Sequence, residues 1–142
     1  MPNTELRRRA RPVLDTLRTL ALQGRTPVLG LRKKSCPYHS WGTVQEDPAT
    51  APGWTPFAPG DAIGGVEAHY CFRGGITAPA GSAGRHLVCL VSTGATDIWN
   101  NNNPQFLAYL NGTLVCGLDV NHTEFDLSPA AAESQTWQLG LY

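Results

Sequence analysis

The chain has 142 residues and a formal net charge of zero, and charged residues make up only 15% of it. Glycine and proline together supply 26 residues, a turn-rich composition that argues against a helical bundle and against a disordered chain. No apolar run approaches the roughly 20 residues that a membrane-spanning helix needs, and no apolar signal segment follows the first basic cluster. We therefore expect a single cytoplasmic domain without membrane contact.

Residues 1–34 are predicted to form a basic helical arm. They carry a net charge of +7, whereas the rest of the chain carries −7. Between Leu6 and Leu22 the apolar residues recur at steps of three and four, which predicts a helix with one buried face. Because Pro12 lies inside this pattern, either the helix kinks there or Pro12 opens a second helical piece.

The charge of this arm is compatible with several partners. The arm can dock on the acidic remainder of the protein or on a neighbouring acidic domain, or it can bind nucleic acid or anionic lipid. Its arginines come without the aromatic-bearing sheet motif with which RRM domains stack RNA bases. We therefore expect docking between protein parts and no nucleic-acid partner.

Residues 35–68 are predicted to form an extended, irregular connection. They hold five prolines and lack a long hydrophobic period. Trp41 and Trp54 lie in this segment, and tryptophan rings are costly to leave in water. We therefore expect the connection to pack on the body of the domain.

From residue 69 onward the pattern is typical of β-strands. Residues 69–73 are aromatic and extended, and Gly74 and Gly75 after them predict a bulge or a bend. Residues 87–91 are apolar at every position. This predicts a strand that is covered on both faces and is therefore not an edge.

The clearest local signal is the pair Asn111 and Gly112 between two β-prone runs. An Asn-Gly pair accepts the positive φ angles of a type I′ turn and predicts a two-residue hairpin. Residues 123–127 and 137–141 then alternate as strands with one buried face do. Together these short strands predict a mainly β fold, a β-sandwich over residues 69–142 with an N-terminal α-helix. Since the alternation continues to the last residues, we expect the sandwich to be truncated and the chain to be a fragment of a larger protein.

The chain has four cysteines, and no two of them form a C-x-x-C motif: they are Cys36, Cys71, Cys89 and Cys116. This spacing is poor for a zinc site, and three of the four lie in strand-like runs, where a thiol acts as a small apolar group. We expect reduced, buried thiols and no metal in this chain.

Four segments carry a distinctive sequence: WTPFAPGD at residues 54–61, GGVEAHYCFR at 64–73, FLAYLNG at 106–112 and GLDVNHTE at 117–124. In this order and spacing they resemble the N-terminal region of the cytosolic or vacuolar type of α-mannosidase, a glycoside hydrolase of family 38. The chain departs from that family's pattern at Ile63 and Cys71, where tryptophan is frequent in the family.

The resemblance implies an accessory jelly-roll domain of galactose-binding-like shape that stands before a large catalytic domain. In that family, His and Asp residues of the catalytic domain hold zinc, and a separate Asp is the nucleophile of a retaining mechanism. The resemblance therefore implies no catalytic residue and no cofactor in this chain, with zinc in the catalytic domain. The implied partners are the catalytic domain, mannose-containing glycans and further copies of the parent enzyme, which would hydrolyse terminal α-mannosides.

Two roles are open for the exposed rings and polar groups. In a carbohydrate-binding module, aromatic rings lie flat on a pyranose while Asn, Asp and Arg side chains reach its hydroxyls. In an interaction module, the same residues pack on the catalytic domain or a sister subunit. The residues predicted for such a carbohydrate or interdomain contact are Trp54, Trp99, Tyr109, Asp119, Asn121, His122 and Glu124.

The acidic cluster around residue 120 has further interpretations. Asp119 and His122 could orient a proton or hold a metal, or they could close a structural loop through Asx hydrogen bonds. Glu124 and Asp126 would lie about 7 Å apart on one strand face, a spacing open to a glycosidase carboxyl pair or to a solvated face. We favour the structural interpretation in both cases.

Overall fold

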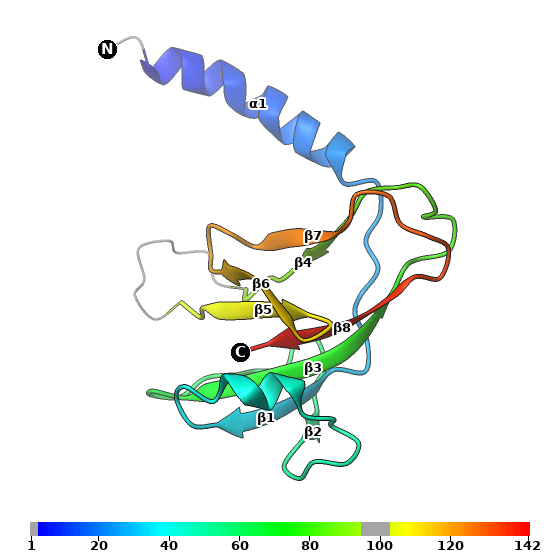
Figure 1. Cartoon of the computed structure of the whole chain (residues 1–142). Helices are drawn as coiled ribbons and strands as arrows, with labels where there is room; N and C mark the ends of the chain where they lie inside the picture. The colour runs from blue at the N-terminus through cyan, green and yellow to red at the C-terminus, as the bar shows by residue number, and fades with distance from the viewer. Residues whose placement is uncertain (1–2, 95–102) are drawn as a thin grey trace.

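The computed structural model describes residues 3–94 and 103–142 and is mainly β, with a single long helix at the N-terminus (Figure 1). The helix is α1 (Asn3–Ala21), and η1 (Trp41–Gln45) is a short 3-10 helix. The strands are β1 (Arg32–Cys36), β2 (Thr55–Pro56), β3 (His69–Thr77), β4 (Leu87–Leu90), β5 (Phe106–Leu110), β6 (Thr113–Leu118), β7 (Glu124–Ser128) and β8 (Thr136–Leu141).

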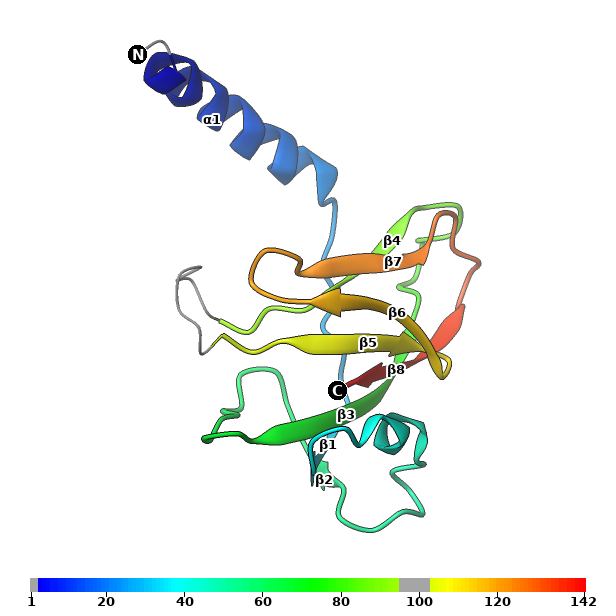
Figure 2. The same ribbon diagram turned by 60° about the vertical axis from the view of Figure 1, so that its left-hand side comes forward.

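The strands form two antiparallel sheets that face each other in a sandwich-like arrangement (Figure 2). The larger sheet has the order β2-β1-β3-β8-β5-β6, and the smaller one pairs β4 with β7. β8, the last strand of the chain, lies between β3 and β5 and pairs with both. β8 is therefore a central strand of the larger sheet.

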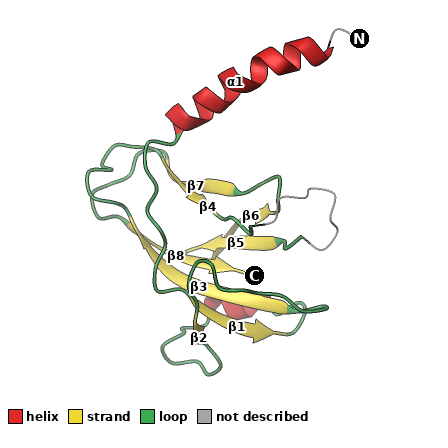
Figure 3. Cartoon of the chain, turned by 180° about the vertical axis from the view of Figure 1, so that it is seen from behind, coloured by secondary structure: helices red, strands yellow, loops and turns green. Residues whose placement is uncertain are grey.

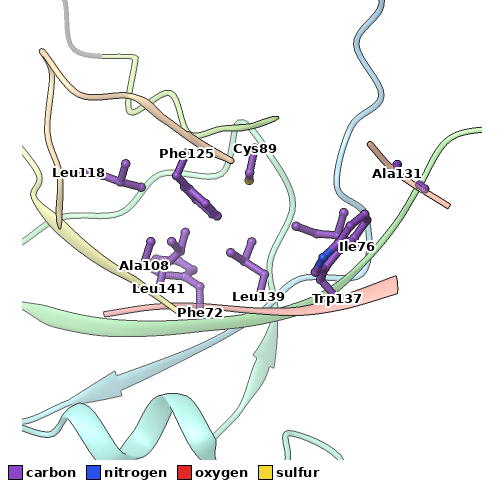
Figure 4. Close-up of a cluster of buried hydrophobic side chains, with 11 residues drawn as sticks. Phe72, Ile76, Cys89, Ala108, Leu118, Phe125, Ala131, Trp137, Leu139 and Leu141 are labelled. Atoms are coloured by element: carbon purple, nitrogen blue, oxygen red, sulfur yellow. The ribbon is translucent and has the colours of Figure 1, made fainter. Parts of the chain in front are cut away.

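The main core lies between the two sheets. Phe72, Leu139 and Leu141 point into it from the larger sheet, and Cys89 and Phe125 point into it from the smaller one (Figure 4). All five side chains are buried. The predicted alternation of β7 and β8 is confirmed, because the apolar members of both strands supply this core.

A second, smaller core covers the opposite face of the larger sheet. This η1 core consists of Cys36, Val44, Trp54, Cys71 and Tyr109. The short helix η1 lies close to the sheet. A Cβ added at Gly140 would lie 3.2 Å from the Cβ of Val44 in η1. A side chain at this position of β8 would therefore require η1 to shift by a few tenths of an ångström.

The larger sheet begins well before residue 69. β1 pairs with β3 over Arg32–Cys36, and β2 pairs with β1. Both strands come from the segments that the sequence divides into a basic arm and an irregular connection. Their residues do not alternate between apolar and polar. β1 is a strand because the edge of β3 offers a row of hydrogen-bonding partners, and β2 pairs in turn with the outer edge of β1.

The hairpin at Asn111 and Gly112 is confirmed. Their φ angles are 51° and 81°, as a type I′ turn requires, and Leu110 pairs with Thr113 across it. The predicted bulge or bend at Gly74 and Gly75 was wrong, because both residues lie within the unbroken strand β3 and keep regular pairing with β8. Gly74 has a packing role instead, since a Cβ there would lie 2.6 Å from Cδ2 of the leucine at position 31.

The prediction that residues 87–91 form a covered, central strand was also wrong. Among the strands in the described parts of the chain, β4 pairs only with β7. Cys89 is buried in the main core, whereas Leu90 is exposed. An apolar run does not distinguish a central strand from an edge strand of a small sheet, because the number of partners is set by the rest of the fold.

The helix α1 extends away from the two sheets (Figure 3). It passes through Pro12 without ending there, and the hydroxyl of Thr16 donates a hydrogen bond to the Pro12 carbonyl at 2.9 Å. The face expected to be buried is exposed instead, at Leu6, Val13 and neighbouring apolar residues. Within the described residues, no helix combines the length and apolar character that a bilayer crossing requires.

Candidate functional site

The residues predicted for a carbohydrate or interdomain contact do not come together in one site. Trp54 and Tyr109 belong to the η1 core and are only 6% and 9% exposed. Asp119, Asn121 and His122 lie in the turn between β6 and β7. The two groups therefore occupy different parts of the fold, and the faces of the two rings pack against protein atoms.

The polar edge of Trp54 is fully engaged inside the protein. Its Nε1 donates a hydrogen bond to Oε2 of Glu46 at 3.1 Å, and Nζ of Lys34 donates to the same oxygen at 2.6 Å. These two donors hold the pKa of Glu46 below its ordinary value, with Lys34 the larger cause. Trp54 thus fastens the loop after η1 to β1, which is a structural role.

The turn between β6 and β7 confirms the structural interpretation of the Asp-x-Asn-His stretch. Oδ1 of Asp119 accepts hydrogen bonds from the backbone N–H groups of Asn121 and His122 at 2.7 and 2.8 Å. These backbone bonds lower the pKa of Asp119, so the carboxylate stays charged while it closes an Asx turn. The described residues contain no group of three or more His, Cys, Asp and Glu side chains that could hold a metal ion.

The other predicted residues have different surroundings. Glu124, the first residue of β7, lines an open cavity of about 520 Å³ beside the end of α1, together with Arg25. Asp126 is exposed on the same strand and accepts a hydrogen bond from His86 at 2.8 Å. Trp99 lies outside the described residues.

The four cysteines form no disulfide, and burial disfavours the reactive thiolate at Cys71 and Cys89. Cys36 and Cys71 are buried with their Sγ atoms 3.4 Å apart. Burial raises the pKa of Cys71 and raises the pKa of Cys89 to about 11. Because the thiolate is the reactive form, these side chains act as core residues.

The residues that sequence reasoning largely missed form an exposed group of rings near the start of β3. We call this the ring cluster; its members are Tyr38, His39, Trp41, His69 and Tyr142. Neighbouring ring centroids lie 3.9 to 6.2 Å apart, and Tyr38 and Trp41 are 65% and 43% exposed. Of these residues only Trp41 carried a signal in the sequence, since the cluster forms only when His69 and Tyr142 meet residues 38–41 from distant parts of the chain.

Exposed rings in this number can stack on an apolar face of a sugar or pack in a protein interface. Comparisons with protein-family models, curated proteins and solved structures give no match to the chain.

Proposed function

We propose that this chain is a non-catalytic accessory domain at the front of an α-mannosidase-like glycosidase, and that it packs against the catalytic domain. In this proposal the sandwich is a jelly roll of galactose-binding-like shape, and the zinc ion and the nucleophile belong to the catalytic domain. The four segments that resemble glycoside hydrolase family 38 support the parentage. The sandwich-like arrangement of two antiparallel sheets is compatible with the accessory role.

The observation that carries the docking role is the apolar stripe of α1. This stripe consists of Leu6, Val13, Leu14, Leu17 and Leu20, which are between 53% and 70% exposed. Amphipathic helices of globular proteins bury such a face, and contiguous exposed apolar surface marks an interaction site. The helix therefore presents a complete docking face that the sheets of this domain do not cover.

The composition of the stripe favours a protein partner over a membrane. Helices that lie in a membrane interface carry Trp or Phe on the apolar face and a strongly basic polar face. Here the apolar face has only leucine, valine and alanine, and Asp15 interrupts the arginines of the helix. A stripe of aliphatic side chains matches the interior of a helix-to-protein interface.

A double substitution in the stripe tests the docking role. In the whole enzyme we expect L14D/L17D to shorten the half-life of thermal inactivation at least about tenfold, because each buried leucine contributes about 1.5–3 kcal/mol. The 142-residue chain alone should keep its unfolding temperature, since the side chains of the stripe are exposed to solvent in it. Activity on 4-nitrophenyl α-mannoside and circular dichroism provide the two measurements.

The matched control is T16D/T19D, which adds the same charge to α1 outside the stripe, at two threonines that are exposed. Equal effects of the two double variants would contradict docking through the stripe. Hydrolysis of the mannoside by the 142-residue chain would contradict a non-catalytic domain. A reading frame without a glycosidase domain would contradict the parentage.

Contact with mannose-containing glycans is the second candidate, and the ring cluster favours it. Tyr38 and Trp41 expose ring surface at one edge of the domain, whereas Trp54 is buried. A pyranose that stacks on this surface changes the environment of Trp41, which is the exposed tryptophan among the described residues.

We expect mannose or mannobiose to quench the tryptophan fluorescence saturably. The substitution W41F should abolish the quenching, while W54F should leave it in place because Trp54 is buried. An unchanged spectrum up to tens of millimolar sugar, or quenching that W41F does not alter, would rule out glycan contact at the ring cluster.

A further inference from the structure

The face of the larger sheet that carries the η1 core also carries a cavity lined by two arginines. The cavity has a volume of about 260 Å³ and opens to solvent. Arg32 on β1 and Arg73 on β3 line it together with Asp47, Gln138, Gly30 and Gly74. We call it the arginine cavity, and it is separate from the ring cluster and from the β6–β7 turn.

The two arginines stand directly opposite each other. Arg32 and Arg73 are register partners in the β1–β3 ladder, so their side chains project from neighbouring positions on the same sheet face. Like charges at directly opposed positions destabilise a sheet. In the described parts of the chain, neither guanidinium forms an ion pair with a carboxylate. The cavity therefore holds two positive charges, and Asp47, the acidic residue that also lines it, forms no ion pair with either of them.

The hydrogen-bonding capacity of the pair is also incompletely used. Nη2 of Arg32 donates to the carbonyl of Trp54 at 3.0 Å, and Nη1 of Arg73 donates to the carbonyl of Val44. These bonds to neutral carbonyls hold the two side chains in place. The Nε atoms of both arginines are buried and have no hydrogen-bond partner, and they are the only buried side-chain nitrogen or oxygen atoms of this kind among the described residues.

We propose that the arginine cavity binds a phosphate group between Arg32 and Arg73. Two guanidinium groups offer planar forks of N–H donors, which match the oxygens of a phosphate. The bound anion supplies a counter-charge and accepts hydrogen bonds from Nη groups of the two guanidiniums, because the Nε atoms are too deeply buried to reach it. A volume of about 260 Å³ admits a phosphate and the first atoms of an attached sugar, whereas a large nucleotide exceeds it.

Asp47 gives the cavity a means to select among anions. Asp47 lines the same cavity, and its Oδ1 already accepts a hydrogen bond from the N–H of Ala49 at 2.9 Å. Asp47 can accept a further hydrogen bond but cannot donate one when it is ionised. Phosphate near neutral pH retains a hydroxyl that donates to such an acceptor, whereas sulfate has none. The cavity should therefore prefer phosphate to sulfate.

Isothermal titration of the 142-residue chain with sodium phosphate tests the proposal. At constant ionic strength, with chloride as the balancing anion, we expect saturable binding of one phosphate per chain and at least about tenfold weaker binding of sulfate. R32Q should weaken phosphate binding at least tenfold, and D47N should reduce the preference over sulfate. Mannose 6-phosphate in the same titration tells whether a free phosphate or a sugar-borne one binds more tightly.

R25Q is the matched control, because Arg25 is exposed and lies outside the arginine cavity. It removes the same charge and should leave phosphate binding unchanged. Arg73 is not the first residue to replace, since it also holds η1 through the Val44 carbonyl, and circular dichroism verifies that R32Q is folded. Absence of saturable phosphate binding, or equal weakening by R25Q and R32Q, would overturn the proposal. Equal affinity for sulfate would overturn the role of Asp47.

Discussion

Replacing Leu139 with alanine should destabilise the folded chain by about 2–5 kcal/mol. Leu139 is 3% exposed on β8, the strand that joins the two halves of the larger sheet, and its side chain belongs to the main core (Figure 4). Truncation removes apolar contact and leaves a cavity that the neighbouring strands cannot close. Urea unfolding followed by circular dichroism measures the loss as a lower midpoint with an unchanged slope.

The same substitution at Leu114 is the control. Leu114 lies on β6 and is 53% exposed, so L114A should change stability by no more than about 0.5 kcal/mol. The two leucines lie in strands of the same sheet and are compared for the effect of burial, because the main core covers Leu139 and leaves Leu114 exposed. Similar losses of stability at both positions would contradict a buried core between the two sheets.

The second large effect is expected at Gly74, where valine should destabilise the chain by about 1–3 kcal/mol through overpacking. A Cβ at this position would lie 2.6 Å from Cδ2 and 3.6 Å from Cα of Leu31. Leu31 itself packs against the main core, so it cannot move away without disturbing other contacts. Thermal and urea unfolding of G74V measure the effect.

The neighbouring glycine provides a control in the same strand. A Cβ at Gly75 meets no atom within 4 Å, and the residue pairs regularly with Gln138. Because valine suits an extended strand better than glycine does, G75V should leave stability unchanged or raise it by up to about 1 kcal/mol. A loss in G75V as large as that in G74V would contradict the close packing of Leu31 as the cause.

The arginine cavity and the ring cluster lie on the same face of the larger sheet, on either side of the η1 core. Alternation along β3 places His69, Cys71 and Arg73 on this face, in the ring cluster, the η1 core and the arginine cavity respectively. The loop that contains η1 covers the middle of the face. Recognition of a sugar and of a phosphate can therefore be tested separately, because no residue is shared between the two surfaces.

The candidate surfaces were poorly visible in the sequence. Trp54 and Tyr109 have the residue types of a sugar platform, but neighbours from distant segments bury them. Arg32 falls in the predicted basic arm, whereas Arg73 falls in one of the segments that carry the family resemblance, so the sequence gives no sign that the two residues meet. Their meeting depends on the β1–β3 register, which brings together residues 41 positions apart in the chain. A local pattern holds no information about such a contact.

The sequence by itself determined those features whose energetics are local. Asn111 and Gly112 turn the chain because of their own backbone preferences. The alternation of β7 and β8 follows because successive side chains of a strand point to opposite faces of the sheet, and one of these faces lies on the main core. Only the tertiary structure decided that the arm contributes β1, that β4 is an edge, and that the apolar stripe of α1 is left uncovered. A hydrophobic period predicts that one face of a segment can be buried. It does not identify the segment that covers this face, because that segment comes from elsewhere in the chain or from another molecule.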